Sequence, residues 1–384
     1  MVDINNIADQ KLDMLDQASR IVIKVGSAVL TDQSGLDLRV VNRLADQIGL
    51  LQDQNREVVL VSSGAVAAGR GSMSAQRMTE SLRCKQAVSA VGQSRLMHAY
   101  DEAFARYGKT TAQVLLTRDD LKSRERFLNA RNTMLQLLQW GIIPIVNEND
   151  TVAVQELKFG DNDALASLVL NLVEADLFIN LTSADGVYDK NPQEDHTARL
   201  IPIIDNIDDL PLETICSGKT LEGSGGMYSK LISARRASQI GVPTLIVSGC
   251  KRFALEKAFS GENGGTFILP GKRCIARRKF WLAYNLDPAG EIIIDAGAAR
   301  AICEHGKSLL PAGILQVRGE FGKGDMIRLM DDANTQLGVG LTNYASFELQ
   351  KIKGHKSNEA AEILGQSMYA EAVHRDNMLM DAVL

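Results

Sequence analysis

The sequence predicts an α/β protein: a three-layer αβα sandwich around a mainly parallel sheet, followed by a small β-rich C-terminal domain. Its length of 384 residues favours two domains, and a content of 45% hydrophobic and 23% charged residues is normal for a globular protein. As far as Gly261, short apolar segments alternate with amphipathic ones, which implies strands joined by right-handed helical crossovers. After Gly261 the segments are short and separated by Gly, Pro and Asp, as in small β-rich domains.

The expected strands of the sandwich are apolar runs, the pattern of strands buried on both faces. They cover residues 20–27, 57–62, 111–116, 142–146, 176–181 and 244–247. The expected helices lie between them at 37–54, 82–106, 124–140, 162–172 and, after a stretch rich in Pro, Asp and Gly, at about 227–240. In the first of these helices Val41, Leu44 and Ile48 recur at helical spacing, so one face should pack on the sheet.

The change of pattern also predicts the domain boundaries. Residues 272–279 (KRCIARRK) are basic and are expected to form an exposed connector. Beyond them come EIIIDAGA, ILQVRGEFGKGDMIRLM and QLGVGLTNYAS, which are typical of short strands with close turns. We expect an N-terminal extension at 1–18, the sandwich domain at 19–262, a linker at 263–281, and the β-rich domain with a tail at 282–384.

Composition and charge narrow the class of protein. The formal charge of −5, from 42 basic and 47 acidic residues, does not point to nucleic acid or to an anionic membrane surface. No apolar run approaches the roughly 18 residues that a membrane-spanning helix needs, and the polar, acidic N-terminus is unlike a signal or transit peptide. The five cysteines are scattered and lack C-x-x-C spacing, which favours reduced thiols and no zinc site. We therefore expect a cytoplasmic protein.

Three common nucleotide-binding signatures are absent. Gly-Lys-Thr or Gly-Lys-Ser occurs three times, but Ala103, Glu213 and Ala301 stand where a P-loop needs its first glycine. His-Arg-Asp at 374–376 imitates a protein-kinase catalytic loop, but Asp381 stands where the required Asn belongs, and no Asp-Phe-Gly follows. There is no G-x-G-x-x-G fingerprint. P-loop, protein-kinase and Rossmann-type nucleotide sites are thereby excluded.

Lys24 is the first residue that points to chemistry. It lies inside an apolar strand, although lysine is seldom fully buried unless it is paired. One interpretation is a sheet-edge lysine whose ammonium reaches water. The other places it at the carboxyl end of a central strand, where open α/β sheets bind ligands. Gly26 would then let phosphate oxygens approach the backbone closely.

Polar residues also end two further expected strands. Ser62, Ser63 and Gly64 leave room for a ligand, and their hydroxyls with the following helix start supply donors for an anion. A helix cap alone would explain them too. Residues 147–150 (Asn-Glu-Asn-Asp) are followed by 160–163 (Gly-Asp-Asn-Asp) at a helix start. Such carboxylates and amides could bind an α-ammonium group or Mg²⁺, or position lysines. The alternative is that they only cap the helix and form a turn.

The segment 223–230 (GSGGMYSK) carries the clearest local signal. Closely spaced glycines before a helix can form a nest of backbone N–H groups for phosphate, and Lys230 on the first turn would face the same anion. A flexible loop with a surface lysine is the alternative. Residues 181–188 (LTSADGVY) form either a turn or a loop that contacts a nucleotide. Most of these motifs follow strands or start helices. Together they indicate phosphoryl transfer, and they point only loosely to a carboxylate as the acceptor.

With these residues the chain resembles the glutamate 5-kinases, of the amino acid kinase fold with a C-terminal PUA domain. The resemblance covers about residues 18–375 and includes IKVGSAVLT, VSSGAVAAGR, RERFLNARNT, IPIVNENDTVA, FGDNDALAS and GSGGMYSK, and in the second domain SLLPAGI and AVHRDNM. Two positions depart from the family pattern. Ser183 stands where members often carry Asp, and Tyr228 replaces a small residue.

The resemblance implies roles for particular residues. Lys24 and Lys230 would be catalytic, with Asp163 orienting both. L-Glutamate would be bound by Ser63, Gly64, Asn147, Asp150 and Asn162. ATP would be bound by Lys24, Gly26, Ser27, Thr182, Ser183, Ser224, Gly225, Gly226, Met227 and Lys230.

The reaction that the resemblance implies is ATP + L-glutamate → ADP + L-glutamyl 5-phosphate, the first step of proline biosynthesis. The acceptor carboxylate is already ionised, so no general base is needed. The protein has to align the reactants and offset charge, which two lysines, backbone amides and Mg²⁺ can do. We expect ATP and Mg²⁺ as cofactors, with no metal site made by protein ligands alone. The resemblance also implies feedback inhibition by L-proline and a homo-oligomer formed through the kinase domain.

Two other functions remain open at this point. One is a different small-acid kinase of the same fold, of the aspartokinase or acetylglutamate kinase type, although no ACT-type regulatory domain is visible. The other is an RNA-binding side function of the PUA domain. From residue 289 to 384 there are 9 Lys and Arg against 13 Asp and Glu, a net charge of −4, which opposes a phosphate-binding surface. We therefore expect neither a nucleic-acid nor a membrane partner.

Overall fold

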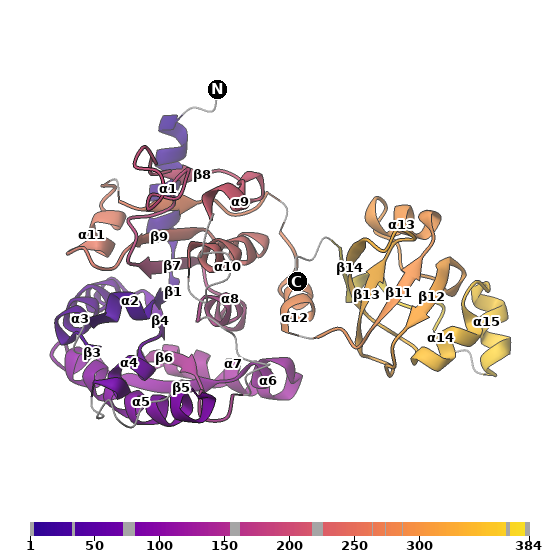
Figure 1. Cartoon of the computed structure of the whole chain (residues 1–384), viewed down its shortest axis with the longest axis horizontal. Helices are drawn as coiled ribbons and strands as arrows, with labels where there is room; N and C mark the ends of the chain where they lie inside the picture. Colours follow the sequence, from indigo (N-terminus) through magenta and orange to yellow (C-terminus); the bar gives the residue numbers. More distant parts are fainter. Residues whose placement is uncertain are drawn as a thin grey trace. The chain divides into compact units, whose positions relative to one another are not determined.

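The computed structural model describes residues 4–32, 35–71, 81–153, 162–216, 226–262, 264–272, 274–285, 287–365 and 369–380. The chain forms two compact units, Met1–Cys274 and Ile275–Leu384. The first holds an eight-stranded sheet and the second a five-stranded sheet (Figure 1). Within the described residues, no helix has the length and apolar character needed to cross a membrane.

The sheet of the first unit is almost entirely parallel. Its strands are β1 (Arg20–Val25), β4 (Glu57–Ser62), β5 (Thr111–Leu116), β6 (Ile143–Glu148), β7 (Leu177–Thr182), β8 (Ile203–Ile204), β9 (Thr244–Ser248) and β10 (Thr266–Ile268). They lie in the order β5-β6-β4-β1-β7-β9-β10-β8, and only β9 and β10 pair antiparallel. The central strand β1 pairs with β4 on one side and with β7 on the other. The order of the strands reverses at β1, and ligands of open α/β sheets bind at the carboxyl end of such a switch point.

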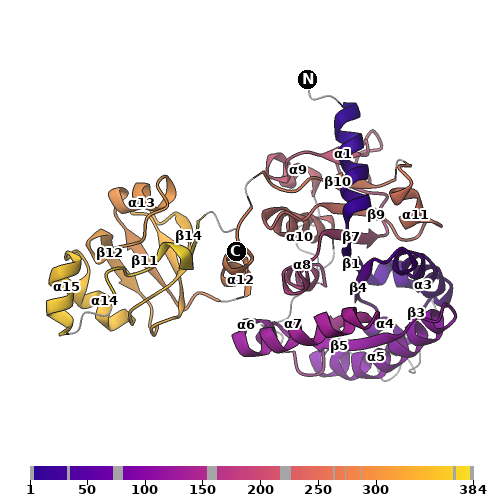
Figure 2. The ribbon, with the colours of Figure 1, turned by 180° about the vertical axis from the view of Figure 1, so that it is seen from behind.

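Helices cover both faces of this sheet, so the predicted three-layer sandwich is confirmed (Figures 1 and 2). On one face lie α3 (Leu38–Asp53), α5 (Leu82–Ala105) and α11 (Ala254–Phe259), and on the other α7 (Arg124–Gln139), α8 (Asn162–Val173) and α10 (Met227–Gln239). Ile21, Ile23 and Val25 of β1 join the core on the first face. Since successive side chains of a strand alternate, Lys24 projects to the second face, toward α8.

Short elements complete the first unit. They are α2 (Ser27–Leu30), β2 (Thr31–Asp32), β3 (Gly35–Leu36), α4 (Ala65–Arg70), α6 (Arg118–Lys122), η3 (Ile207–Asp209) and α9 (Leu212–Ile215). All expected strands and helices of the sandwich are present, with ends within a few residues of the predicted ranges. The sequence did not predict β8, β10, α9 or α11, which are too short to show a clear period.

The helices α4 and α5 approach each other closely through two glycines. A Cβ atom at Gly92 would lie 1.7 Å from the carbonyl oxygen of Ala65, and one at Gly69 would lie 2.0 Å from that of Val88. Neither helix can carry a side chain at these points. The contact fixes α4, and with it the turn at Gly64, whose φ of 106° is a conformation that favours glycine.

The predicted N-terminal extension at 1–18 belongs to the first unit where the structure describes it. Residues Ile4–Gln17 form the helix α1, which belongs to the first unit. Leu15 and Ala18 are buried in the main core, and Leu12 lies against Gly261. Lys11 is also buried, and this desolvation lowers the pKa of its ammonium. The polar composition of the segment concealed these few apolar anchors.

The predicted linker at 263–281 is also corrected. The strand β10 pairs with β9 and therefore belongs to the sheet of the first unit, and the division between the units follows Cys274. The exposed connector predicted at 272–279 runs into the helix α12 (Arg277–Asn285). Arg278 and Lys279 of this helix donate hydrogen bonds to Asn377 and to the carbonyl of Arg375. The helix was not predicted because its basic first residues suggested an exposed connector, although apolar residues follow them.

The second unit is the expected small β-rich domain, with helices that the sequence did not predict. Its sheet has the order β12-β11-β13-β14-β15. The strands are β11 (Gly290–Ile294), β12 (Ile314–Arg318), β13 (Met326–Met330), β14 (Gln336–Leu341) and β15 (Met378–Met380). The helices are α13 (Ala296–Cys303), η5 (Pro311–Gly313), α14 (Ser346–Ile352), α15 (Ser357–Leu364) and η6 (Arg375–Asn377). Ile292, Ile327 and Leu329 lie at the centre of its core.

The α4–α5 contact yields a stability prediction. We expect Gly92→Ala to lower the free energy of unfolding by about 1–3 kcal/mol, because the added methyl group overlaps the backbone of α4. The matched control is Gly264→Ala, since a Cβ atom there meets nothing within 4 Å. Denaturant unfolding of both variants provides the measurement. If Gly92→Ala unfolds at the same denaturant concentration as the control, the two helices are not locked together at this point.

Candidate active site

A cavity of about 620 Å³ opens at the carboxyl ends of β6, β4, β1 and β7, which are neighbours in the sheet. The sequence motifs that follow these strands therefore meet in one place, as predicted. Of the predicted site residues, the cavity is lined by Lys24, Gly26, Ser27, Ser63, Gly64, Asn147, Asp150, Asn162, Thr182, Ser183 and Lys230. Glu148 and Arg70 also line it, although neither was among the predicted site residues.

Asp163 stands at the centre of the charged groups. It lies in the first turn of α8 and is fully buried. The Lys24 ammonium lies 2.5 Å from its Oδ1 atom, and the Lys230 ammonium lies 3.0 Å from its Oδ2 atom. Lys24 is only 1% exposed, which rules out the sheet-edge lysine reaching water. Two ammonium groups around one carboxylate leave a positive charge at the cavity floor, which favours an anionic ligand.

Two neutral groups complete the surroundings of this carboxylate. Asn180 of β7 donates from Nδ2 to Oδ1 at 3.0 Å, and Ser229 of α10 donates from Oγ to Oδ2 at 2.7 Å. Four elements, β1, β7, α8 and α10, thus converge on a single side chain. The sequence analysis missed Asn180, although a polar residue inside the apolar run LFINLT is the same signal that identified Lys24.

Gly26 keeps the approach to Lys24 open. Its N–H donates to the carbonyl of Leu181 at 3.3 Å, which ties the end of β1 to β7. A Cβ atom at this position would stand 3.9 Å from the Lys24 Nζ atom. Any larger side chain would enter the space in front of the ammonium group, so glycine leaves that space to a ligand.

A chain of amides occupies the other end of the cavity. Asn162 Nδ2 lies 2.8 Å from Ser63 Oγ and 3.0 Å from Asn147 Oδ1. The Asn147 amide in turn donates to Gln93 at 2.8 Å. These contacts fix the polar ends of β4, β6 and α8 relative to one another. The residues predicted for substrate binding are thereby held together on the β6 side of the lysines.

Helix α5 supports this end with two residues that the sequence analysis missed. Ser89 donates to the Asp150 carboxylate at 2.6 Å, and Gln93 accepts from Asn147. Both side chains are buried, and they lie one helical turn apart. Their spacing of four residues on an otherwise apolar face was the available signal.

Part of the predicted nucleotide loop cannot be placed. Ser224 and Gly225 lie outside the described residues, as do residues 154–161 before α8. Gly226 is the N-terminal cap of α10, and its carbonyl accepts from Ser229 and Lys230. Met227 is not among the residues that line the cavity, and its predicted contact with ATP stays a prediction. Its side chain packs against the apolar cluster that includes Leu231, because Met227 and Leu231 share one face of α10.

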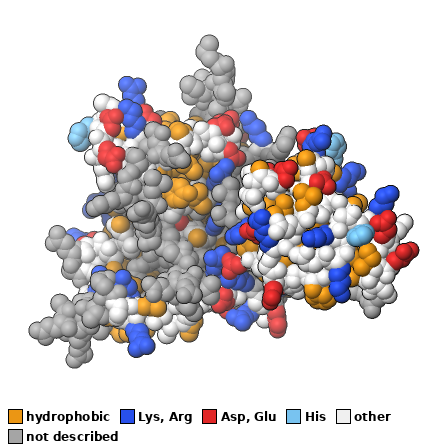
Figure 3. Space-filling model, turned by 45° about the vertical axis from the view of Figure 1, so that its right-hand side comes forward, with side chains coloured by type: hydrophobic (Ala, Val, Ile, Leu, Met, Phe, Trp, Pro, Cys, Tyr) orange, Lys and Arg blue, Asp and Glu red, His pale blue; other side chains and the backbone are white. Residues whose placement is uncertain are grey.

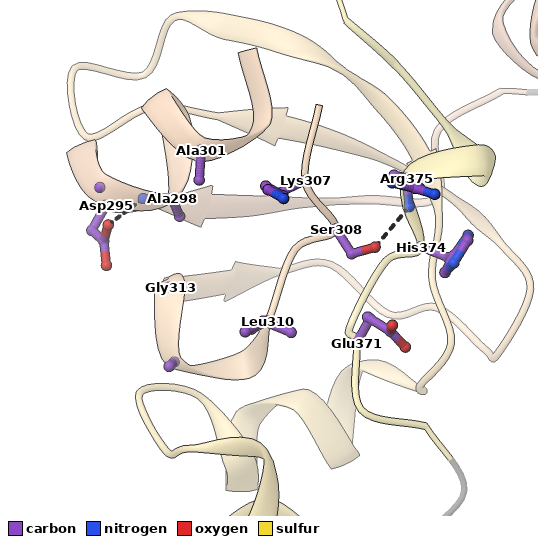
Figure 4. A pocket seen from close by; sticks show the side chains of 12 residues that line it. Asp295, Ala298, Ala301, Lys307, Ser308, Leu310, Gly313, Glu371, His374 and Arg375 are labelled. Carbon is purple, nitrogen blue, oxygen red and sulfur yellow. Dashed lines mark hydrogen bonds between the residues drawn. The ribbon is translucent and has the colours of Figure 1, made fainter. Parts of the chain in front are cut away.

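The second unit has a cavity of its own, of about 670 Å³, between α13 and the segments around Ser308 and Arg375 (Figure 4). Lys307, His374 and Arg375 line it together with the acidic Asp295 and Glu371. Asp295 caps α13 through the N–H of Ala298, and Ser308 accepts from the N–H of Arg375. Figure 3 likewise shows basic, acidic and apolar side chains interspersed on the visible face of this unit. Neither view indicates a surface of one charge.

The cluster around Asp163 yields a second stability prediction. We expect Asp163→Asn to lower the free energy of unfolding by about 3–5 kcal/mol, because two buried ammonium groups lose the carboxylate that lies between them. The control is Glu262→Gln, which removes the exposed ion pair with Lys257 and should leave stability nearly unchanged. Chemical denaturation of both variants measures the difference. Equal effects would contradict a central role of Asp163 in holding the unit together.

Comparison with known proteins gives two family matches. Residues 19–248 match the amino acid kinase family, and residues 290–364 match the PUA domain. The glutamate 5-kinase of Maridesulfovibrio salexigens is 57% identical over 97% of this chain and 99% of that protein. Those of Nitratidesulfovibrio vulgaris strain DP4 and Geobacter sulfurreducens are 56% and 47% identical, over 98% and 96% of this chain and 99% of each relative.

These matches span both units, and the first of them contains β1, β4, β6, β7, α8 and α10, the elements that build the cavity. The chain therefore belongs to the amino acid kinase family, within the group of glutamate 5-kinases that carry a C-terminal PUA domain.

Proposed function

We propose that this protein transfers the γ-phosphoryl group of ATP to the side-chain carboxylate of L-glutamate. The products are ADP and L-glutamyl 5-phosphate, and the reaction is the first step of proline biosynthesis. The nearly full-length identity to glutamate 5-kinases supports the choice of substrate. The observation that carries the chemistry is the buried pair of lysines on Asp163, which gives the cavity floor a positive charge where a transferred phosphoryl group has to lie.

The chemical step needs alignment and charge compensation rather than a general base. Near pH 7 the glutamate carboxylate is ionised, since its ordinary pKa is about 4.3. One of its oxygens forms the new bond to the γ-phosphorus as the bond to the β-phosphate oxygen of ATP breaks. Lys24 and Lys230 hold the oxygens of the group in transit, and Asp163 keeps both ammonium groups in place. The buried setting strengthens these interactions.

The amide end of the cavity is the proposed glutamate site. Asp150 receives the α-ammonium group, and Ser63, Asn147 and Asn162 hold the remaining polar atoms. Gly64 starts α4 and places the N–H groups of that helix at the cavity. The distance along the cavity from these residues to Lys24 then decides which carboxylate of the substrate meets the phosphoryl group. The preference for glutamate over the aspartokinase reaction rests on the nearly full-length identity to glutamate 5-kinases.

The nucleotide is assigned to the β7 side. Thr182 and Ser183 line the cavity there, next to Gly26, Ser27 and the start of α10. Both oxygens of Asp163 are engaged by protein donors, and the described residues contain no group of three or more His, Cys, Asp or Glu that could hold a metal. Mg²⁺ would bind mainly through the ATP phosphates, and Asp150 and Glu148 are carboxylates on the cavity wall. Bound in this way it neutralises phosphate charge.

Three further properties are included in the proposal because the family assignment supports them. L-Proline would act as a feedback inhibitor at or near the glutamate site. The protein would form a homo-oligomer through its kinase domain, and it would work in the cytoplasm. An RNA-binding side function of the PUA domain is not included, because residues 289–384 carry a net charge of −4 and the cavity of this unit is lined by both signs of charge.

The catalytic assignment is tested by trapping acyl phosphate with hydroxylamine in the presence of Mg-ATP. We expect Lys24→Ala and Lys230→Ala each to lower kcat roughly 100–1,000-fold, the usual loss when one group that stabilises transition-state charge is removed. Lys190→Ala, which removes a surface lysine paired with Asp195, is the control and should keep the wild-type rate. Full activity in either buried-lysine variant would refute its role. Activity on aspartate or N-acetylglutamate but not on glutamate would refute the substrate.

Inhibition by proline has a separate test. We expect excess L-proline to lower the rate at low glutamate concentration and to lose this effect as glutamate is raised, because both amino acids present an ammonium group to Asp150. In the variant Asp150→Asn, the KM for glutamate and the inhibition constant for proline should therefore rise together. Initial rates over a grid of the two concentrations measure both constants. An unchanged rate at low glutamate and excess proline would exclude this inhibition.

A further inference from the structure

Asn180 is a fully buried polar residue in an otherwise apolar strand. In the sheet it lies directly beside Lys24, as the two residues are partners in the β1–β7 register. Side chains at one level of adjacent strands share a face, so the amide and the ammonium both project toward α8. There the Asn180 amide donates to the same oxygen of Asp163 that accepts from Lys24.

The two polar atoms of the Asn180 amide differ in their hydrogen bonding. Its Nδ2 group is used, but its Oδ1 atom is buried and has no hydrogen-bond partner among the described residues. An unpaired buried carbonyl lowers stability, and nearly all such groups in folded proteins have partners. A leucine of similar size would avoid the penalty, since the flanking residues of β7 are apolar. The contact that favours an asparagine here is therefore the hydrogen bond from its Nδ2 group to the buried carboxylate of Asp163.

We propose that Asn180 is a positioning residue for phosphoryl transfer, which fixes the Asp163 carboxylate so that each of its oxygens faces one lysine. The inference rests on the proposed function. The donors to Oδ1 include Lys24 and Asn180, and the donors to Oδ2 include Lys230 and Ser229. Each oxygen is thus contacted by a cationic and a neutral donor.

The two neutral donors are not equivalent. Ser229 has a single hydroxyl hydrogen, and its Oγ atom lies within bonding distance of both Asp163 and the carbonyl of Gly226. Among the described residues the Asn180 amide donates only to Asp163, so it is the steadier anchor. The other neighbour of Lys24 in the sheet is Val61, which has no donor to replace it. Without Asn180, the carboxylate is free to turn, and Lys24 loses its alignment with the phosphoryl group.

The first test separates positioning from ordinary structural support. In Asn180→Leu, we expect the melting temperature to change little, because removal of the unpaired carbonyl offsets the lost hydrogen bond to Asp163. We expect kcat for acyl-phosphate formation to fall about 10–100-fold, the loss typical when a ligating group loses its supporting hydrogen bond. KM for glutamate should change little, because the glutamate site lies on the other side of β1. The matched control is Asn171→Leu, a buried asparagine further along α8, which should keep the wild-type kcat.

A second variant gives a pH signature that a structural role would not produce. The charged groups around position 180 are Lys24 from β1, Asp163 from α8 and Lys230 from α10. In Asn180→Asp, burial and the neighbouring Asp163 raise the pKa of the introduced carboxyl while Lys24 and Lys230 lower it, so it titrates together with the cluster. Above that pKa it repels Asp163 and cancels the positive charge of the cavity floor. Below it the carboxyl is protonated and can donate as the amide did. The rate relative to wild type should therefore rise as the pH falls.

The outcomes are distinct. A lower kcat in Asn180→Leu with unchanged or higher stability, together with the rising relative rate of Asn180→Asp at low pH, supports the inference. A wild-type kcat in Asn180→Leu overturns it, and so does a loss of rate that is matched by a loss of stability. Absence of acyl phosphate from the wild-type enzyme with glutamate would instead overturn the proposed function, and with it this inference.

Discussion

A buried carboxylate between two ammonium groups is the interaction on which the active site of this protein depends. Asp163 is reached by β1, β7 and α10 from three different parts of the chain, and it belongs to a fourth element, α8. Charges cannot be buried at this depth unless they are paired and hydrogen-bonded. The cluster therefore forms only when the sheet has its full central strands and both helices lie on the correct face. Folding and assembly of the site are in this sense the same event.

The amide end of the cavity depends on a different kind of constraint, which is close packing. Helix α5 carries Ser89 and Gln93, whose side chains hold Asp150 and Asn147. The same helix contacts α4 at Gly92, where no side chain fits. Because Gly64 is the N-terminal cap of α4, the helix α5 that supports Asp150 and Asn147 also fixes the turn that borders them. Electrostatics thus organise the lysine end of the cavity, and steric exclusion organises the amide end.

Much of this arrangement could be predicted from the sequence, because long apolar strands and amphipathic helices have clear periods. The parallel order then placed the polar residues after β1, β4, β6 and β7 at one edge. The elements that were missed have weak local signals: β10 has three residues, and α1 buries few apolar side chains in a polar segment. The direction of the Met227 side chain, toward an apolar cluster, could not be predicted from a glycine-rich motif. Asn180 and Gln93 were missed because the role of a single polar residue depends on its hydrogen-bond partner, and the fold brings that partner from a distant part of the sequence.

The alternation of side chains in β1 limits how this chain can change. Lys24 faces α8 only because it is one residue out of phase with Ile23 and Val25, which belong to the opposite core. Inserting or deleting one residue in β1 would turn the lysine into an apolar core and place an isoleucine or valine beneath Asp163. Both layers would be damaged by the same event, so the strand can vary by substitution but hardly by length. A site whose key residue depends on the alternation of side chains in a central strand therefore does not tolerate insertions or deletions in that strand.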